Sequence, residues 1–179
     1  ELLNLCQSWT LGNETELWVN AVTMDAGPGW HHSSWVFVGE NAYPGPDGTW
    51  DCSDRSFSEA VAGALGGVFF AQSTQATHEA QRFPAGTAYR IPRRAKIIGS
   101  VHLINASRNE LRSSLHFDIE TVPAADVRTR LRPLAIDNTG IRIAPRGRAA
   151  STTSCDLATG YQRATGHGTD FSVYYVLPH

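Results

Sequence analysis

The feature that most constrains the fold of this chain is its alternation of short β-forming runs with strong turn signals. Runs rich in Val, Ile, Trp, Tyr and Phe are separated by clusters of Gly, Pro, Asn and Asp, most clearly at 27–29, 43–48 and 84–86. Gly and Pro at this density end regular structure and favour tight turns. The pattern is typical of antiparallel β structure, and we expect an all-β fold.

The expected strands lie near Glu16–Thr23, Ser33–Val38, Thr87–Ile91, Ile97–Ile104, Leu111–Thr121, Gly140–Ile143 and Phe171–Leu177. The segment 123–132 could form a helical turn. Short strands at this spacing indicate a β-sandwich or a jelly roll.

A domain boundary is expected where the apolar strand ending at Ile104 gives way to the polar loop 105–110. We therefore predict two antiparallel, jelly-roll-like β-sandwich domains, over residues 1–105 and 106–179. The apolar segment Phe171–Leu177 has the composition of a core strand, and the sequence stops two residues after it. Domains seldom end directly after such a strand, so we expect the second domain to be only partly present.

Composition excludes several classes of partner. The net charge is −2 and the longest basic run is Arg93-Arg94, which argues against nucleic acid and anionic membranes. The longest nearly apolar stretch, Ala60 to Ala71, is too short to cross a bilayer and contains three glycines. The chain opens on a polar segment without a basic region. If the protein is secreted or periplasmic, its signal peptide has been removed.

The cysteines are odd in number: Cys6, Cys52 and Cys155. In an exported protein this leaves one of them without a partner inside the chain. The unpaired cysteine is either a free, buried residue or one whose partner lies beyond residue 179.

The adjacent pair His31-His32 is a candidate metal ligand set. Neighbouring side chains of a regular strand point to opposite faces, so the two rings can share one metal only if the backbone bends. Gly27-Pro28-Gly29 directly precedes the pair and favours such a bend. The alternative is a surface dipeptide beside the packed rings of Trp30 and Trp35.

His102 is the best single ligand candidate, because it lies within the strongly apolar strand Ile97–Ile104. A buried imidazole needs a hydrogen-bond partner or a metal, so a satisfied core histidine is the alternative. His78 and His167 lie in polar contexts, and His116 is expected to face solvent on an alternating strand. The sequence contains no His-Glu-x-x-His motif, Gly-x-Ser-x-Gly elbow, P-loop or dinucleotide fingerprint.

The segments 29–37, 83–89 and 100–105 together carry a His-His pair, a Phe-Pro-x-Gly turn before a strand, and a lone His in an apolar strand. In this order they resemble the copper type II, ascorbate-dependent monooxygenases, the family of peptidylglycine alpha-hydroxylating and dopamine beta-monooxygenases. The resemblance implies that His31, His32 and His102 hold the copper that stores electrons.

In that family a second copper is held by a strand ending in His-x-His and by a later Met. Here the segment ending at His179 is similar to the start of that motif, so the resemblance implies that His179 is a ligand of the oxygen-activating copper. The rest of that site would lie beyond the chain, and Cys155 would pair there too. Leu177 stands where peptide-amidating members have an arginine, which argues against a peptidylglycine substrate. The only methionine, Met24, precedes the His pair. The family's dense first-domain disulfides are reduced to Cys6 and Cys52 at most.

The function implied is hydroxylation of a C–H bond of a small-molecule or peptide-like substrate, with O2 and a one-electron donor such as ascorbate. The chain alone would bind one copper well and would not turn over. Two alternatives stay open. One is a carbohydrate- or cell-surface-binding module that uses exposed Trp30, Trp35 and Trp50 as a stacking platform. The other is a structural β-sandwich without a metal.

Overall fold

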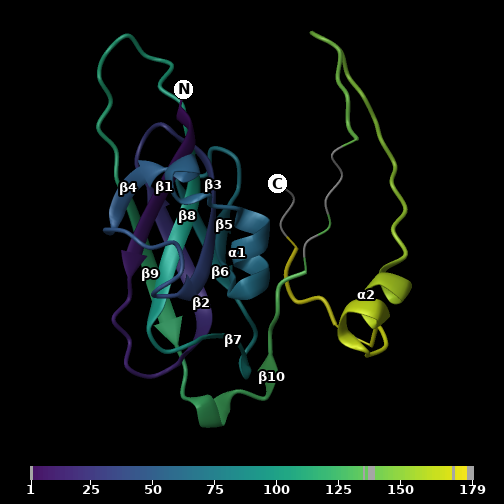
Figure 1. Ribbon diagram of the computed structural model, residues 1–179. Helices are drawn as coiled ribbons and strands as arrows, with labels where there is room; N and C mark the ends of the chain where they lie inside the picture. The colour runs from purple at the N-terminus through teal and green to yellow at the C-terminus, as the bar shows by residue number, and fades with distance from the viewer. Residues whose placement is uncertain (1, 135, 137–139, 171, 177–179) are drawn as a thin grey trace. The chain divides into compact units, whose positions relative to one another are not determined.

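The computed structural model describes residues 2–134, 136, 140–170 and 172–176, and it confirms a mainly β fold (Figure 1). The strands are β1 (Leu2–Thr10), β2 (Leu17–Ala26), β3 (Trp30–Gly39), β4 (Gly48–Asp51), β5 (Gly67–Gln72), β6 (His78–Arg82), β7 (Thr87–Ile91), β8 (Ala95–Leu103), β9 (Leu115–Thr121) and β10 (Thr129–Arg130). The helices are α1 (Glu59–Leu65) and α2 (Leu157–Thr165), with 3-10 turns η1 (Cys52–Arg55) and η2 (Ala124–Asp126).

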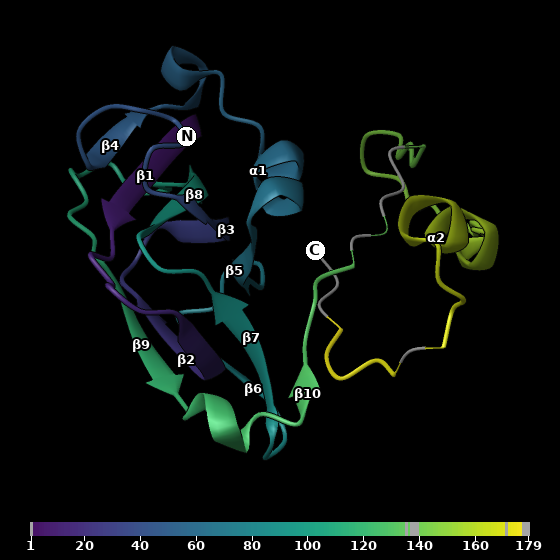
Figure 2. The same ribbon diagram turned by 60° about the horizontal axis from the view of Figure 1, so that its bottom comes forward.

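Two sheets form the body of the fold. The first has the strand order β4-β1-β8-β3-β5, and the second has the order β10-β7-β2-β6, with β9 also paired to β2. All of these pairings are antiparallel except that of β10 with β7. Figure 2 shows β9, β2, β7 and β6 on one side of the fold and β1, β8, β3 and β5 on the other.

The main core lies between these sheets, because each contributes one alternating face. Trp35 from β3 and Ile97 from β8 pack in one cluster with Val19 and Met24 from β2, and all four side chains are fully buried. Burying a large apolar side chain stabilises the fold by roughly 1.5–3 kcal/mol, so this face accounts for much of the driving force for folding.

A smaller core lies on the other face of the first sheet and is closed by a disulfide. Cys6 of β1 is bonded to Cys52 of η1, with an S–S distance of 2.08 Å and a sequence separation of 46 residues. The sequence left the pairing of the three cysteines open, and the structure pairs Cys6 with Cys52. Closing a loop of that length restricts the unfolded chain and contributes on the order of 4 kcal/mol. Cys155 is free and exposed.

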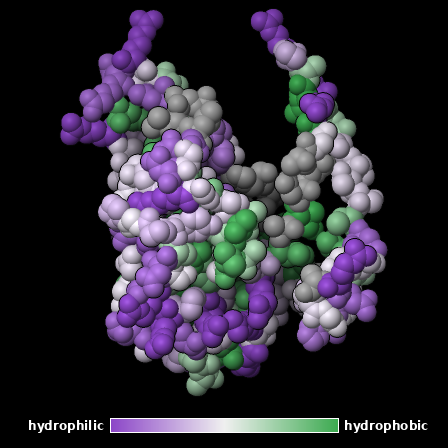
Figure 3. Space-filling view, viewed as in Figure 1, coloured by the Kyte–Doolittle hydropathy of each residue, from purple (hydrophilic) through white to green (hydrophobic). Residues whose placement is uncertain are grey.

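Helix α1 lies against the first sheet, and most of its side chains stay at least partly exposed. Ser58 caps its N-terminus by accepting from the Val61 N–H, and Ala62 is its buried residue. Val61 and Leu65 are 52% and 77% exposed, and Figure 3 shows apolar surface over this helix. Neither helix of the described residues is long and apolar enough to span a membrane.

The prediction of strands over 140–143 and 171–177 is wrong for the residues that the structure describes. Residues 140–143 and 172–176 form no strand, and residues 171 and 177 lie outside the described part of the chain. Ile141, Ile143, Val173 and Val176 are all more than half exposed. A single apolar run has no stability as a strand until a neighbour satisfies its backbone groups and covers its side chains.

Other boundaries shift because pairing partners decide them. The expected strand Leu111–Thr121 begins at Leu115. The segment 123–132 contains the expected helical turn, as the 3-10 turn η2, and then the strand β10. Strands β1, β4 and β6 carried too little alternation or apolar content to be anticipated. Strand β5 was also missed, although it is an apolar run.

The chain divides into two compact units: residues 1–133 together with the segment from Tyr175 onward, and residues 134–174. β9 belongs to the first unit, because it pairs with β2 from Val19 to Ala26. The boundary suggested after residue 105 falls between β8 and β9, inside this first unit. The second unit contains α2, which Asp156 caps by accepting from the Thr159 N–H and which ends at Gly166 in the left-handed conformation.

Candidate metal centre

The site begins at an irregularity where β3 starts. Trp30 pairs with Leu103 of β8, but His32 pairs with His102, so β3 contains one extra residue at His31. A bulge of this kind bends the strand and re-aims its side chains. Gly29 precedes it at φ +90°, and a Cβ there would lie 2.6 Å from Leu111 Cδ2. The predicted backbone bend is therefore confirmed, and its position requires glycine.

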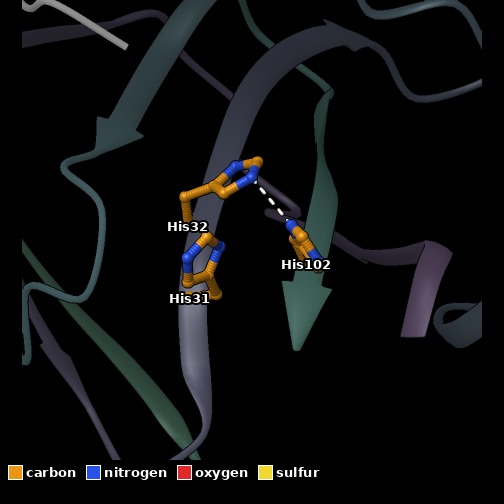
Figure 4. Close-up of side chains that lie close together, drawn as sticks. All are labelled: His31, His32 and His102. Atoms are coloured by element: carbon orange, nitrogen blue, oxygen red, sulfur yellow. Dashed lines mark hydrogen bonds between the residues drawn. The ribbon is translucent and has the colours of Figure 1, made fainter. Parts of the chain in front are cut away.

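The bulge turns the two adjacent histidines toward the neighbouring strand (Figure 4). The ring centroids are 5.1 Å apart for His31 and His32, 4.8 Å for His31 and His102, and 4.7 Å for His32 and His102. Each ring offers one nitrogen such that these atoms all lie within 4.8 Å of one another, and all three residues are half-buried. We call these three residues the histidine triad.

Hydrogen bonding within the triad is incomplete. His102 Nδ1 lies 2.8 Å from His32 Nε2, so one of the two nitrogens carries the shared proton. The Nδ1 atom of His31 is buried and has no hydrogen-bond partner among the described residues. Leaving such a group unsatisfied costs roughly 1–3 kcal/mol. A metal ion bound to the triad would remove that cost if Nδ1 were the ligating atom.

His102 is less deeply buried than its apolar strand suggested. The first five residues of β8 are buried, whereas His102 and Leu103 at its end are half-buried. The strand end therefore places the imidazole at the margin of the core, where an ion from solvent can reach it.

A buried polar network holds the backbone beside the triad. Trp35 Nε1 donates to Ser33 Oγ at 2.8 Å, Ser33 Oγ donates to Gln72 Oε1 at 2.7 Å, and these three residues are 0% exposed. Gln72 Nε2 in turn donates to Ala76 O at 2.7 Å.

That network holds the loop 73–77, which contacts the triad directly. The backbone N–H of Gln75 in this loop donates to His31 O at 2.5 Å. The bond from Gln72 to Ala76 therefore restrains the loop, and the loop in turn restrains the backbone of His31. Sequence reasoning missed Gln72; its signal is a polar residue at the end of the apolar run Gly67–Gln72.

The other histidines that the structure describes do not belong to the triad. His78 lies on β6 beside Asp25, and His116 lies exposed on β9, as expected. His167 is exposed after α2. His179, the candidate ligand of a second copper, lies outside the described residues, as does Leu177. Met24 is fully buried in the main core.

The three tryptophans of the alternative binding module form no stacking platform. Trp30, Trp35 and Trp50 are 8%, 0% and 9% exposed, so none presents a ring face to a sugar. Trp35 packs instead against Trp9 and Phe117, with ring centroids 5.2 and 5.3 Å apart.

Comparison of the chain with protein-family models, with curated proteins and with solved structures finds no match. The interpretation of the site therefore rests on its own chemistry. Three imidazoles without a thiolate or a carboxylate suit zinc, copper, iron and nickel, and affinity in such a site is highest for Cu²⁺. The triad can hold a metal ion.

Proposed function

We propose that this chain binds one copper ion through His31, His32 and His102, and that this copper is the electron-entry centre of a copper-dependent monooxygenase. The observation that carries the proposal is the gathering of three imidazole nitrogens within 4.8 Å of one another. Neutral imidazoles accommodate both Cu(I) and Cu(II), so a bound copper can accept and release single electrons.

In this proposal, different parts of the fold place the three ligands, restrict water and limit backbone movement at the site. The bulge at His31 brings two consecutive rings to one side of the strand, and the β3–β8 register supplies the third ring from a residue 70 positions away. Half-burial excludes bulk water from part of the site and leaves the metal accessible to a donor such as ascorbate. Gln72 and Ser33 limit the movement of the His31 backbone, which favours a preformed site.

The oxygenase part of the proposal is supported by the resemblance to the copper type II, ascorbate-dependent monooxygenases. There, a His-His pair, a Pro-x-Gly turn and a lone strand His occur in the order found here. His179 would contribute to the oxygen-activating copper, which needs further ligands. We therefore expect the chain alone to exchange electrons with ascorbate without hydroxylating a substrate of the small-molecule or peptide-like class.

The disulfide is consistent with an oxidising compartment, because such bonds persist outside the reducing cytosol. A secreted or periplasmic location is part of the same proposal. Copper enzymes that draw electrons from ascorbate are compatible with that setting.

The test is a Cu(II) titration followed by electron paramagnetic resonance. We expect one copper equivalent with a type II signal coupled to three nitrogens, one from each imidazole of the triad. His102→Ala should abolish this three-nitrogen signal, whereas His167→Ala, which removes an exposed histidine outside the triad, should leave it unchanged. A three-nitrogen signal that survives His102→Ala would overturn the assignment of the ligands.

A second measurement separates the metal site from its function. Ascorbate added without oxygen should abolish the Cu(II) signal, and air should restore it. If copper binds through the triad but ascorbate leaves the signal intact, the metal site stands and the monooxygenase assignment fails. Substrate hydroxylation by the 179-residue chain alone would contradict the proposal that this chain holds the electron-entry copper and not a complete oxygen-activating site.

A further inference from the structure

The outer face of the second sheet carries another group of metal-ligating side chains, which the triad does not use. Asp25 on the central strand β2 pairs with His78 on β6 and with His116 on β9. Residues directly opposite each other in antiparallel strands project from the same face. The three side chains are 55%, 67% and 69% exposed, so this His-Asp-His row lies open to solvent.

Another row on the same face, two rows away, shows that side chains from β6 and β9 can meet above β2. Ala21 pairs with Arg82 on one side and Glu120 on the other. The two charged side chains close over it in a bidentate ion pair of 2.7 and 2.6 Å, and Ala21 is 0% exposed. Flanking strands are about 10 Å apart, twice the strand spacing, and this pair spans that gap directly.

In the His-Asp-His row the gap is partly filled already. His78 Nδ1 lies 2.7 Å from Asp25 Oδ1, which is a hydrogen-bond distance. The two atoms would move apart to the roughly 3.3 Å that separates two donor atoms on one tetrahedral zinc with bonds of about 2.0–2.1 Å. His116 Nε2 is turned along its own strand to Asp118 Oδ1, at 3.2 Å. Because His116 is exposed, rotation of its side chain toward Asp25 meets little resistance.

We propose that Asp25, His78 and His116 form a second site, for a divalent transition-metal ion of the zinc class. Two imidazoles and one carboxylate complete three positions of a tetrahedral zinc and leave the fourth for water or another ligand. Asp118 holds the His116 ring when no metal is bound, and it becomes the partner of the second ring nitrogen when the metal binds. This site is independent of the histidine triad, because the two share no residue.

The site is tested by titrating the chain with Zn²⁺ in a calorimeter, using a background that lacks the triad. In the variant His102→Ala, one equivalent of Zn²⁺ should remain. Adding His116→Ala or Asp25→Asn should weaken that binding at least tenfold. The matched control, His167→Ala in the same background, should not change it. Because Asp25, His116 and His167 are exposed, thermal unfolding should show that each added change leaves the background variant folded.

The outcomes for the two metal sites are distinguishable. Loss of the three-nitrogen copper signal in His102→Ala with retention of the Zn²⁺ equivalent supports both sites. If the His102→Ala variant binds no Zn²⁺ equivalent, or if His116→Ala and His167→Ala weaken it equally, the second site is overturned and the triad is unaffected. Co²⁺ in place of Zn²⁺ gives a further check, since a tetrahedral site yields intense visible absorption and scattered surface binding does not.

Discussion

The histidine triad and the His-Asp-His row use similar side chains but depend on opposite kinds of backbone. The triad is half-buried and relies on a bulge, which turns two consecutive residues of β3 to one side. The row is exposed and relies on regular register across three strands. The bulge and the buried network hold the triad in advance, whereas the row must gather its ligands by side-chain rotation. Preorganised ligands bind more tightly, so we expect the triad to hold its metal with the higher affinity.

The largest expected effect comes from removing the glycine that allows the bulge. Gly29→Val places a β-branched side chain at φ +90° and against Leu111. It should lower the free energy of unfolding by about 3 kcal/mol and abolish copper binding by the triad. Zinc binding by the row should survive in the folded fraction. Chemical denaturation and copper titration of the same samples measure both effects.

Gly12→Ala is the matched control for backbone strain. Gly12 also has a positive φ, of +64°, but a Cβ there would have no atom within 4 Å. The variant should cost about 1 kcal/mol and leave copper affinity unchanged. Equal loss of copper binding in the two variants would mean that general destabilisation, rather than the bulge, controls the triad.

An intermediate effect is expected from breaking the network behind His31. Gln72→Leu keeps the volume but removes the bonds to Ser33 and Ala76. It should destabilise the fold by roughly 1–3 kcal/mol and weaken copper binding by about tenfold, in the range seen when outer-shell partners of metal ligands are lost. Isothermal titration gives the affinity, and the nitrogen coupling in the resonance spectrum should become less uniform as the His31 ring gains freedom.

Gln81→Leu is the control for that experiment. Gln81 is also a buried glutamine, and its side chain donates to Ala71 O rather than to the loop that contacts His31. The change should cost similar stability without altering the copper affinity. A comparable loss of affinity in both glutamine variants would contradict a positioning role for Gln72.

The smallest effect concerns the Arg82–Glu120 ion pair, which lies on the same face of the sheet as the His-Asp-His row. The Arg82 guanidinium lowers the pKa of Glu120 below its usual 4.5 through a hydrogen bond and charge attraction. A depressed carboxyl pKa contributes stability that is complete above the unfolded value and is lost as the pH falls through the folded value. The small stability difference between the protein and Glu120→Gln should therefore shrink as the pH falls below the usual carboxyl pKa and vanish below the lowered pKa of the folded state, as unfolding curves across pH would show. Copper binding by the triad at neutral pH should be identical in the two proteins.

Local patterns in the sequence were enough for several features. The alternation of β-forming runs and turns predicted the mainly β fold, and Gly27-Pro28-Gly29 before the His pair predicted the bend. Both depend on interactions within a few residues, which sequence patterns record directly. The solvent exposure of His116 followed in the same way from strand alternation.

Features that depend on contacts between residues far apart in the sequence could not be predicted from local patterns. The segments 140–143 and 172–176 have the composition of strands, yet they have no pairing partner in the described residues and stay irregular. Trp30 and Trp50 could be taken for a sugar-binding surface until the packing of the two cores buried them. The contribution of Gln72 became visible only when β5 was placed beside β3.

The sequence by itself determined the mainly β structure with many turns, the His pair after a glycine turn, and the lone His in an apolar strand. The tertiary structure alone decided which of these residues lie close together. His32 and His102 lie opposite each other because of the β3–β8 register, and Asp25 lies between His78 and His116 because β2 is flanked by β6 and β9. Strand register is set by the burial of whole faces and by turn geometry, so it is a property of the folded sheet and not of any short segment.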